Sequence, residues 1–205
     1  MIVRLTCGAL EGVDAFRVDL EVDYARQGMP AFVMVGLAEG AVREAKERVF
    51  AALRASGFRL PPARITVNLA PADRRKAGSA YDLPLAVGLL AASGLLDPDR
   101  AAGWVLAGEL SLTGDIKPVP GILPLALLAR AQGSRGMLTA PAAAAEAAVV
   151  EGLPVYAPRT LGEAAAFLSG SLELPAARFT PPDHPAPFPL DFADVTGQEQ
   201  AKRAP

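Results

Sequence analysis

The amino-acid sequence predicts an α+β fold, in which helices pack against a mixed β-sheet. Three observations predict this class. Residues 16–22 alternate apolar and charged side chains with a period of two, as in a strand with one buried face. Residues 38–56 repeat apolar side chains every three or four positions, as in an amphipathic helix. Between residues 65 and 114, a strand, a polar loop, an Ala/Leu-rich helix and a further strand follow one another.

The first part of the chain predicts three strands and a helix. Residues 1–5 are β-prone, and the continuous apolar run 31–35 predicts a more buried strand than residues 16–22. Short turns join these strands, which favours an antiparallel start. In the helix 38–56, Glu44 precedes Arg48 by four residues, so an ion pair is expected, and Gly57 fits a left-handed cap. The apolar stripe consists of Val42, Ala45, Val49, Ala52 and Leu53.

The second part predicts alternating strands and helices. Residues 65–69 form a strand, and residues 81–93 form a buried helix. Asp82 lies near the start of that helix, where its carboxylate can accept bonds from free backbone N–H groups. Gly108 and Gly114 are expected to bound a hairpin rather than to bind a nucleotide. The remaining elements are a bent strand or strand pair at 104–112, a second buried helix at 122–131, short strands at 137–140 and 155–157, and helices around 142–149 and 161–168.

Composition bounds the function. The 205 residues, 51% apolar and 6% aromatic, suffice for one Ala/Leu/Val-packed core and a tail. The net charge of −2 gives no overall field toward nucleic acid or membrane, so any nucleic-acid contact needs a local patch. The single Cys7 and single His184 argue against a disulfide framework and a Cys/His metal site. No secretory signal and no bilayer-length apolar run occur, so a cytoplasmic location without a membrane partner is expected.

The proline distribution predicts three parts. Six prolines fall within residues 171–190, which predicts an extended linker after a domain of residues 1–170. Residues 191–205 are too few for a domain. They are expected to open a helix that belongs to a further module.

Two constellations in the sequence could carry chemistry or binding. A Ser–Lys hydrolase needs a hydroxyl beside a lysine of lowered pKa, and Ser79 with Lys117 is the one pair worth testing. The alternative places Ser79 in a loop and Lys117 in a solvated turn. The loop holding Arg74, Arg75 and Lys76 could contact phosphates, although a plain solvated loop is the competing interpretation because no aromatic residues are interleaved. No Gly-Lys dipeptide occurs, so this chain has no ATP site of its own.

Several blocks in order, including ITVNLAPADRRKAGSAYDLPLAVGLLAASG, LAGELSLTGDIKPVPGILPLAL and DFADVTGQEQAKRA, resemble the N-terminal region of ComM/YifB-type proteins, which are described as magnesium chelatase-related or competence proteins. The resemblance implies a Lon-protease-like domain of the ribosomal-protein-like superfamily, with a left-handed βαβ crossover. It also implies a bacterial AAA+ ATPase module starting near residues 194–199, which would use ATP and magnesium. Such proteins are understood as hexameric motors that promote DNA branch migration.

Comparison with Lon proteases implies that the catalytic positions have changed. The position of their serine is held by Asp82 and that of their lysine by Leu123. We therefore expect no catalytic residue, no metal and no cofactor in this chain. Its expected work is assembly with its own ATPase module and neighbouring subunits, or engagement of DNA or a partner. Two alternatives stay open: an active hydrolase using Ser79 and Lys117, and a nucleic-acid-binding module using Arg74, Arg75 and Lys76.

Overall fold

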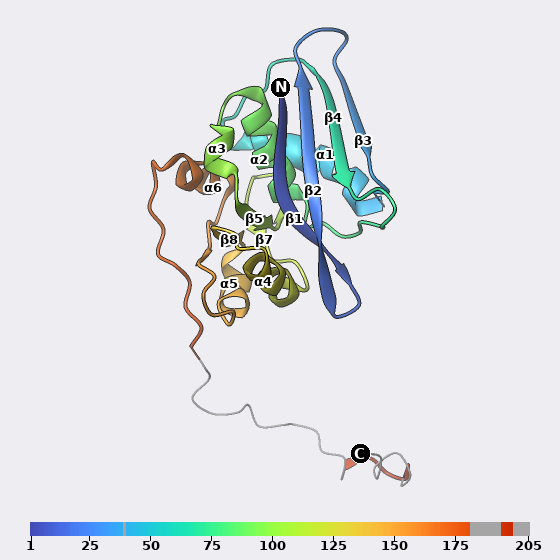
Figure 1. Cartoon of the computed structure of the whole chain (residues 1–205), viewed down its shortest axis with the longest axis vertical. Helices are drawn as coiled ribbons and strands as arrows, with labels where there is room; N and C mark the ends of the chain where they lie inside the picture. The colour runs from blue at the N-terminus through green and yellow to red at the C-terminus, as the bar shows by residue number, and fades with distance from the viewer. Residues whose placement is uncertain (39, 181–193, 199–205) are drawn as a thin grey trace.

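A computed structural model describes residues 1–38, 40–180 and 194–198 (Figure 1). In these residues, seven strands form one mixed sheet of order β3-β4-β2-β1-β5-β8-β9, and β6 and β7 form a separate ribbon. The strands are β1 (Ile2–Glu11), β2 (Asp14–Ala25), β3 (Ala31–Val35), β4 (Arg64–Ala70), β5 (Trp104–Ala107), β6 (Glu109–Leu110), β7 (Ile116–Lys117), β8 (Gly136–Thr139) and β9 (Val155–Tyr156). The helices are α1 (Gly40–Ala55), α2 (Asp82–Ser93), α3 (Pro98–Ala101), α4 (Ile122–Ala131), α5 (Pro141–Ala147) and α6 (Leu161–Ser169).

The sheet is antiparallel on one side and parallel on the other. β1 pairs with β2, and β2 with β4, in antiparallel register, whereas β1, β5, β8 and β9 are parallel neighbours. The antiparallel start is thus confirmed for β1 and β2. It is wrong for β3, which pairs with β4 in parallel because the crossover helix α1 lies between them in the chain.

The prediction that β3 is a more buried strand is wrong. Its residues alternate between exposed and half-buried, and Val33 and Val35 are 39% and 46% exposed. β3 lies at the edge of the sheet, where β4 is its neighbour on one side. An apolar run does not distinguish an edge strand from a central one, because that difference depends on sheet order.

The amphipathic pattern of α1 is confirmed. The five residues of its predicted stripe are all buried, and Arg48 lies 3.8 Å from Glu44. Gly57 has a φ of 83°, as a left-handed turn after the helix requires. This stripe packs α1 against α2, and the opposite face of α1 lies at the surface.

Helices cover both faces of the sheet. All twelve residues of α2 are buried, which confirms the predicted buried helix. It approaches the sheet at Gly88, where a Cβ atom would lie 2.9 Å from Val22 Cγ2. α4 packs on the opposite face at Gly8, where a Cβ atom would lie 2.4 Å from Leu125 Cδ2. The second buried helix predicted at 122–131 is confirmed in its position, but α4 buries one face only.

Within the predicted region 104–112, β5 and β6 are two strands that belong to different sheets and do not pair with each other. β5 ends at Ala107, Gly108 follows, and β6 pairs with β7 around a turn at Gly114. Gly108 thus precedes the hairpin, as expected, whereas Gly114 lies in its turn rather than at its boundary. The predicted short strands and helices beyond residue 136 are confirmed to within two residues at each end.

The described part of the tail contains no helix or strand between residues 171 and 180. One backbone bond still joins it to the sheet, because the N–H of Ala177 donates to the carbonyl of Val155 at 2.7 Å. Residues 181–193 and 199–205 lie outside the described residues; they include the second half of the predicted linker and, apart from residues 194–198, the predicted start of the ATPase module. Across the described segments, no helix has the length and apolarity to cross a bilayer, and no group of three His, Cys, Asp or Glu side chains could hold a metal ion.

Candidate functional site

The carboxylate of Asp82, at the first residue of α2, is held by donors from two other elements. Its side chain is 1% exposed. Arg48 of α1 donates from Nε to Oδ2 at 2.6 Å and from Nη2 to Oδ1 at 2.9 Å. The backbone N–H of Leu110 in β6 donates to Oδ2 at 3.1 Å. The expected bonds to free N–H groups of its own helix are replaced by this N–H from β6, and the pair joins α1, α2 and β6.

The electrostatics of this pair favour a fixed, ionised bridge. Burial raises the pKa of Asp82, and the bonds from Arg48 and Leu110 oppose that shift. The bond to Asp82 raises the pKa of Arg48, which also donates from Nη2 to the carbonyl of Ala41 at 2.9 Å. Both carboxylate oxygens of Asp82 therefore accept charge-assisted bonds from within the fold.

Leu123, the residue expected at the position of the Lon-protease lysine, has a different environment from that of Asp82. It lies half-buried in α4 beside α5, and its backbone N–H donates to Oε1 of Glu146 at 3.1 Å. Asp82 instead faces α1 and β6. Each of these two positions therefore serves the packing of its own helix, and the side chain of Leu123 offers no proton acceptor.

Ser79 lines a cavity of about 360 Å³ between the loop before α2 and the start of α4. The serine is half-buried, and its carbonyl accepts the N–H of Asp82 at 3.1 Å. The buried hydroxyl of Tyr81, which also lines the cavity, has no hydrogen-bond partner among the described residues, and burial raises its pKa. Lys117 is exposed on β7 and is not among the residues that line this cavity. The structure therefore leaves Ser79 without the predicted base on the cavity wall.

The three cations of the loop before α2 do not form one exposed patch. Lys76 is fully buried, and its ammonium donates to the carbonyls of Pro71 and Arg74, the second at 2.7 Å. Burial lowers the pKa of Lys76. Arg74 donates to Glu11, and its guanidinium lies 3.4 Å from the centre of the Phe16 ring. The competing interpretation of a plain solvated loop is wrong for Lys76.

The structural role of Lys76 narrows the binding hypothesis for this loop. Its ammonium is turned inward to close the loop, so it cannot meet a phosphate without breaking both carbonyl bonds. Arg75 is exposed and lines the Ser79 cavity. Contact with nucleic acid through Arg74 and Arg75 stays a prediction.

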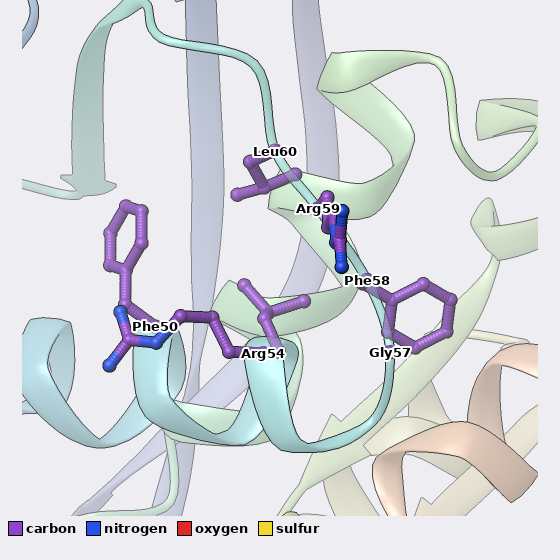
Figure 2. Close-up of a pocket in the computed structure, with 7 residues that line it drawn as sticks. Phe50, Arg54, Gly57, Phe58, Arg59 and Leu60 are labelled. Carbon is purple, nitrogen blue, oxygen red and sulfur yellow. The ribbon is translucent and has the colours of Figure 1, made fainter.

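A second concave region was not predicted. A cavity of about 590 Å³ lies between the last turns of α1 and residues 57–60 (Figure 2). Figure 2 shows Phe50 and Arg54 on the helix, with Arg59 and Leu60 on the segment that runs back beside it. The sequence held a signal for it, since Lys46, Phe50 and Arg54 recur at four-residue steps.

The comparison with family models assigns the chain. Residues 20–143 match the family described as subunit ChlI of Mg-chelatase, and the chain belongs to this family. Among curated relatives, it is 41% identical over 197 residues to competence protein ComM of Haemophilus influenzae, covering 94% of this chain and 38% of that protein. It is also similar to the uncharacterized protein YifB of Salmonella typhimurium, at 42% over 195 residues with 94% and 37% covered, and to that of Escherichia coli, at 40% over 192 residues with 94% and 37% covered. The chain thus spans less than two fifths of the length of these relatives.

Proposed function

We propose that this chain acts as the non-catalytic N-terminal domain of a bacterial AAA+ ATPase, with a Lon-protease-like fold and its left-handed βαβ crossover. In this proposal it serves the assembly of a homo-hexamer and the engagement of DNA or a partner. A separate module holds ATP and magnesium. The similarity to a protein named for competence supports a role in DNA recombination during transformation. The chain length, under two fifths of that relative, supports a division of labour with a further module.

The observation that carries the proposal is the pairing of Asp82. A hydrolase of this design needs a free nucleophile at the start of α2 and an amine within hydrogen-bond reach. Here the carboxylate accepts two bonds from Arg48 and one from Leu110. The neighbouring hydroxyl of Ser79 has no lysine on its cavity wall.

Catalytic silence is tested with a fluorophosphonate probe, which labels activated serines. The wild-type chain and the Ser79→Ala variant should both remain unlabelled above the level of heat-denatured protein. Labelling of the wild type that disappears in Ser79→Ala would establish the hydrolase alternative. The Lys117→Ala variant then separates a Ser–Lys dyad from an isolated reactive serine.

The ATPase assignment is tested on the reading frame beyond Pro205. We expect a Gly-x-x-x-x-Gly-Lys-[Ser/Thr] loop there, and magnesium-dependent ATP hydrolysis by the longer protein. Light scattering of that protein, with and without residues 1–170, measures assembly. A frame lacking the loop contradicts the ATPase proposal, and unchanged assembly and unchanged DNA-stimulated hydrolysis after the deletion contradict the proposed role of this domain.

A further inference from the structure

Two adjoining cavities form one groove along the outer side of α1. The first, about 590 Å³, lies over Phe50, Arg54 and residues 57–60 (Figure 2). The second, about 290 Å³, extends toward β3 and Lys46. Phe50 and Leu60 line both cavities and form their common wall. We name this surface the α1 groove.

Aromatic rings form the floor of the α1 groove. Phe32 and Phe50 pack edge to face, with ring centres 5.8 Å apart and an angle of 82° between the rings. Phe58 is also among the lining residues of the first cavity, but Figure 2 shows its ring turned to the far side of residues 57–60, away from Phe50. Phe32 and Phe50 are half-buried and pack against the core, so both rings are held in place while part of each remains exposed. Rigid, partly exposed rings are suited to stack against flat ligand groups.

The charged side chains of the groove are all cationic. Lys46 lies 5.8 Å from the centre of the Phe32 ring, and Arg54 and Arg59 line the first cavity. Over the described residues, Arg54 and Arg59 have no ion pair and no side-chain hydrogen bond, while Lys46 lies 3.7 Å from the exposed Glu47. No described Asp or Glu lines either cavity. Two guanidinium groups therefore face the groove with their donors available.

The spacing of these groups follows the helix. Lys46, Phe50 and Arg54 lie four residues apart on α1, so each step advances about 6 Å along the axis. Lys46, Phe50 and Arg54 thus alternate cation, ring and cation along the helix. Arg59 lies on the segment 57–60, on the other side of the groove. The overall charge of −2 gives no general attraction for polyanions, so a local cluster of this kind is what nucleic-acid binding would require.

From this arrangement we propose that the α1 groove binds single-stranded nucleic acid. Bases pack against Phe50, which lines both cavities, and backbone phosphates accept bonds from Arg54 and Arg59. Unpaired bases fit because a duplex would hide their faces from rings recessed in a cavity. An acidic peptide would satisfy the cations but would gain nothing from the flat rings beyond apolar contact. The inference rests on the proposed role in DNA engagement and adds the surface and the strand state.

The test measures fluorescence anisotropy of a fluorescein-labelled oligothymidylate with the full 205-residue chain at low salt. We expect saturable binding that unlabelled single strands displace better than the matching duplex does. Arg54→Gln with Arg59→Gln should weaken binding at least tenfold. Losing two phosphate contacts at about 0.7 each should also reduce the slope of log affinity against log salt by about 1.4. Phe50→Leu keeps an apolar side chain but removes the ring, and should weaken binding several-fold.

A matched control removes the same charge elsewhere. Arg130 and Arg159 are exposed and lie outside both cavities, so Arg130→Gln with Arg159→Gln should bind like the wild type. Thermal melting checks that every variant is folded. Absence of wild-type binding at low salt overturns the proposal, as does equal loss in the control.

Two further outcomes assign the ligand or the surface differently. Unchanged binding in Phe50→Leu, with displacement by polyglutamate, would assign the groove to acidic peptides and overturn the proposal. Loss confined to Arg74→Gln with Arg75→Gln would assign binding to the loop before α2. Neither outcome bears on catalytic silence or on the ATPase module, which the serine probe and the reading frame test separately.

Discussion

The arginine in the middle of α1 and the two arginines at and beyond its C-terminal turn have opposite environments. Arg48 is bound to a buried carboxylate, a backbone carbonyl and a helix neighbour, whereas Arg54 and Arg59 line a groove and have no such partner among the described residues. The guanidinium of Arg48 uses its N–H donors in bonds that hold α1 and α2 together. The guanidinium groups of Arg54 and Arg59 leave their donors for a ligand. The role of a charged residue in this domain therefore depends on its bonding partners. From this contrast we expect substitutions of paired charges to lower the free energy of unfolding more than substitutions of unpaired ones.

The largest effect should follow removal of the buried carboxylate. Asp82→Ala leaves Arg48 without its main partner and the N–H of Leu110 without an acceptor, so we expect the free energy of unfolding to fall by about 3 kcal/mol. Urea denaturation measures it. The double variant Arg48→Met with Asp82→Leu removes both charges and should recover all but about 1 kcal/mol. A loss below about 0.5 kcal/mol in Asp82→Ala would contradict the stabilising role of the bonds between Arg48 and Asp82.

A smaller, pH-dependent effect should follow removal of the buried ammonium. Lys76→Met leaves two carbonyls without their donor but relieves the burial of a charge, so a net cost of about 1 kcal/mol is expected near neutral pH. Burial lowers the folded-state pKa of Lys76 below its ordinary 10.5, so the unfolded chain binds more protons between the two values. The wild type should gain stability relative to Lys76→Met as pH rises through that window. A difference that stays constant across it would contradict the burial of this charge.

Removing the more exposed carboxylate of Glu21 should have a still smaller effect on the free energy of unfolding. The pKa of Glu21 is lowered by the bond from Asn68 at 2.9 Å and by Arg4, on the solvent side of β1, β2 and β4. Glu21→Gln should cost about 0.5 kcal/mol at pH 7. That contribution is present above the ordinary value of 4.5 and is lost as pH falls through the lowered folded-state pKa. Urea melts of both proteins at pH 7 and pH 3 should show a smaller difference at the lower pH.

The smallest effect should come from the groove itself. Arg54→Gln with Arg59→Gln removes two cations that make no described intramolecular bond, so the free energy of unfolding should change by less than about 0.5 kcal/mol. The same urea assay measures it. A loss of 1 kcal/mol or more would show that these arginines stabilise the fold, and would remove the contrast with Arg48.

Local patterns predicted much of this fold. The stripe on α1, the alternation in β2 and β4, and the Ala/Leu-rich composition of α2 depend on residues a few positions apart, and each was confirmed. The exposure of β3 depends on the sheet order, which brings β4 between β2 and β3. Periodicity carries no information about such long-range order, so the burial of β3 was predicted wrongly.

The candidate site was less predictable than the fold. Asp82 was identified, but its partner Arg48 lies 34 residues earlier in the chain and was assigned only the nearby Glu44. Lys76 resembles its neighbours Arg74 and Arg75 in sequence, yet it alone of the three is buried. Which cation turns inward depends on carbonyls gathered by a folded loop. The α1 groove needs residues 57–60 to fold back beside the helix, and no local pattern predicts that return.

The contact between Ala177 and Val155 bears on how this protein should be handled. Ala177 also packs beside the core around β8 and β9, so the strand β9 carries a backbone neighbour on its outer side. A fragment trimmed after residue 170 would bare that flank and leave a carbonyl acceptor open to another molecule's extended segment. Fragments for crystallography should therefore retain residues through 180, so that the carbonyl of Val155 keeps its bond from Ala177.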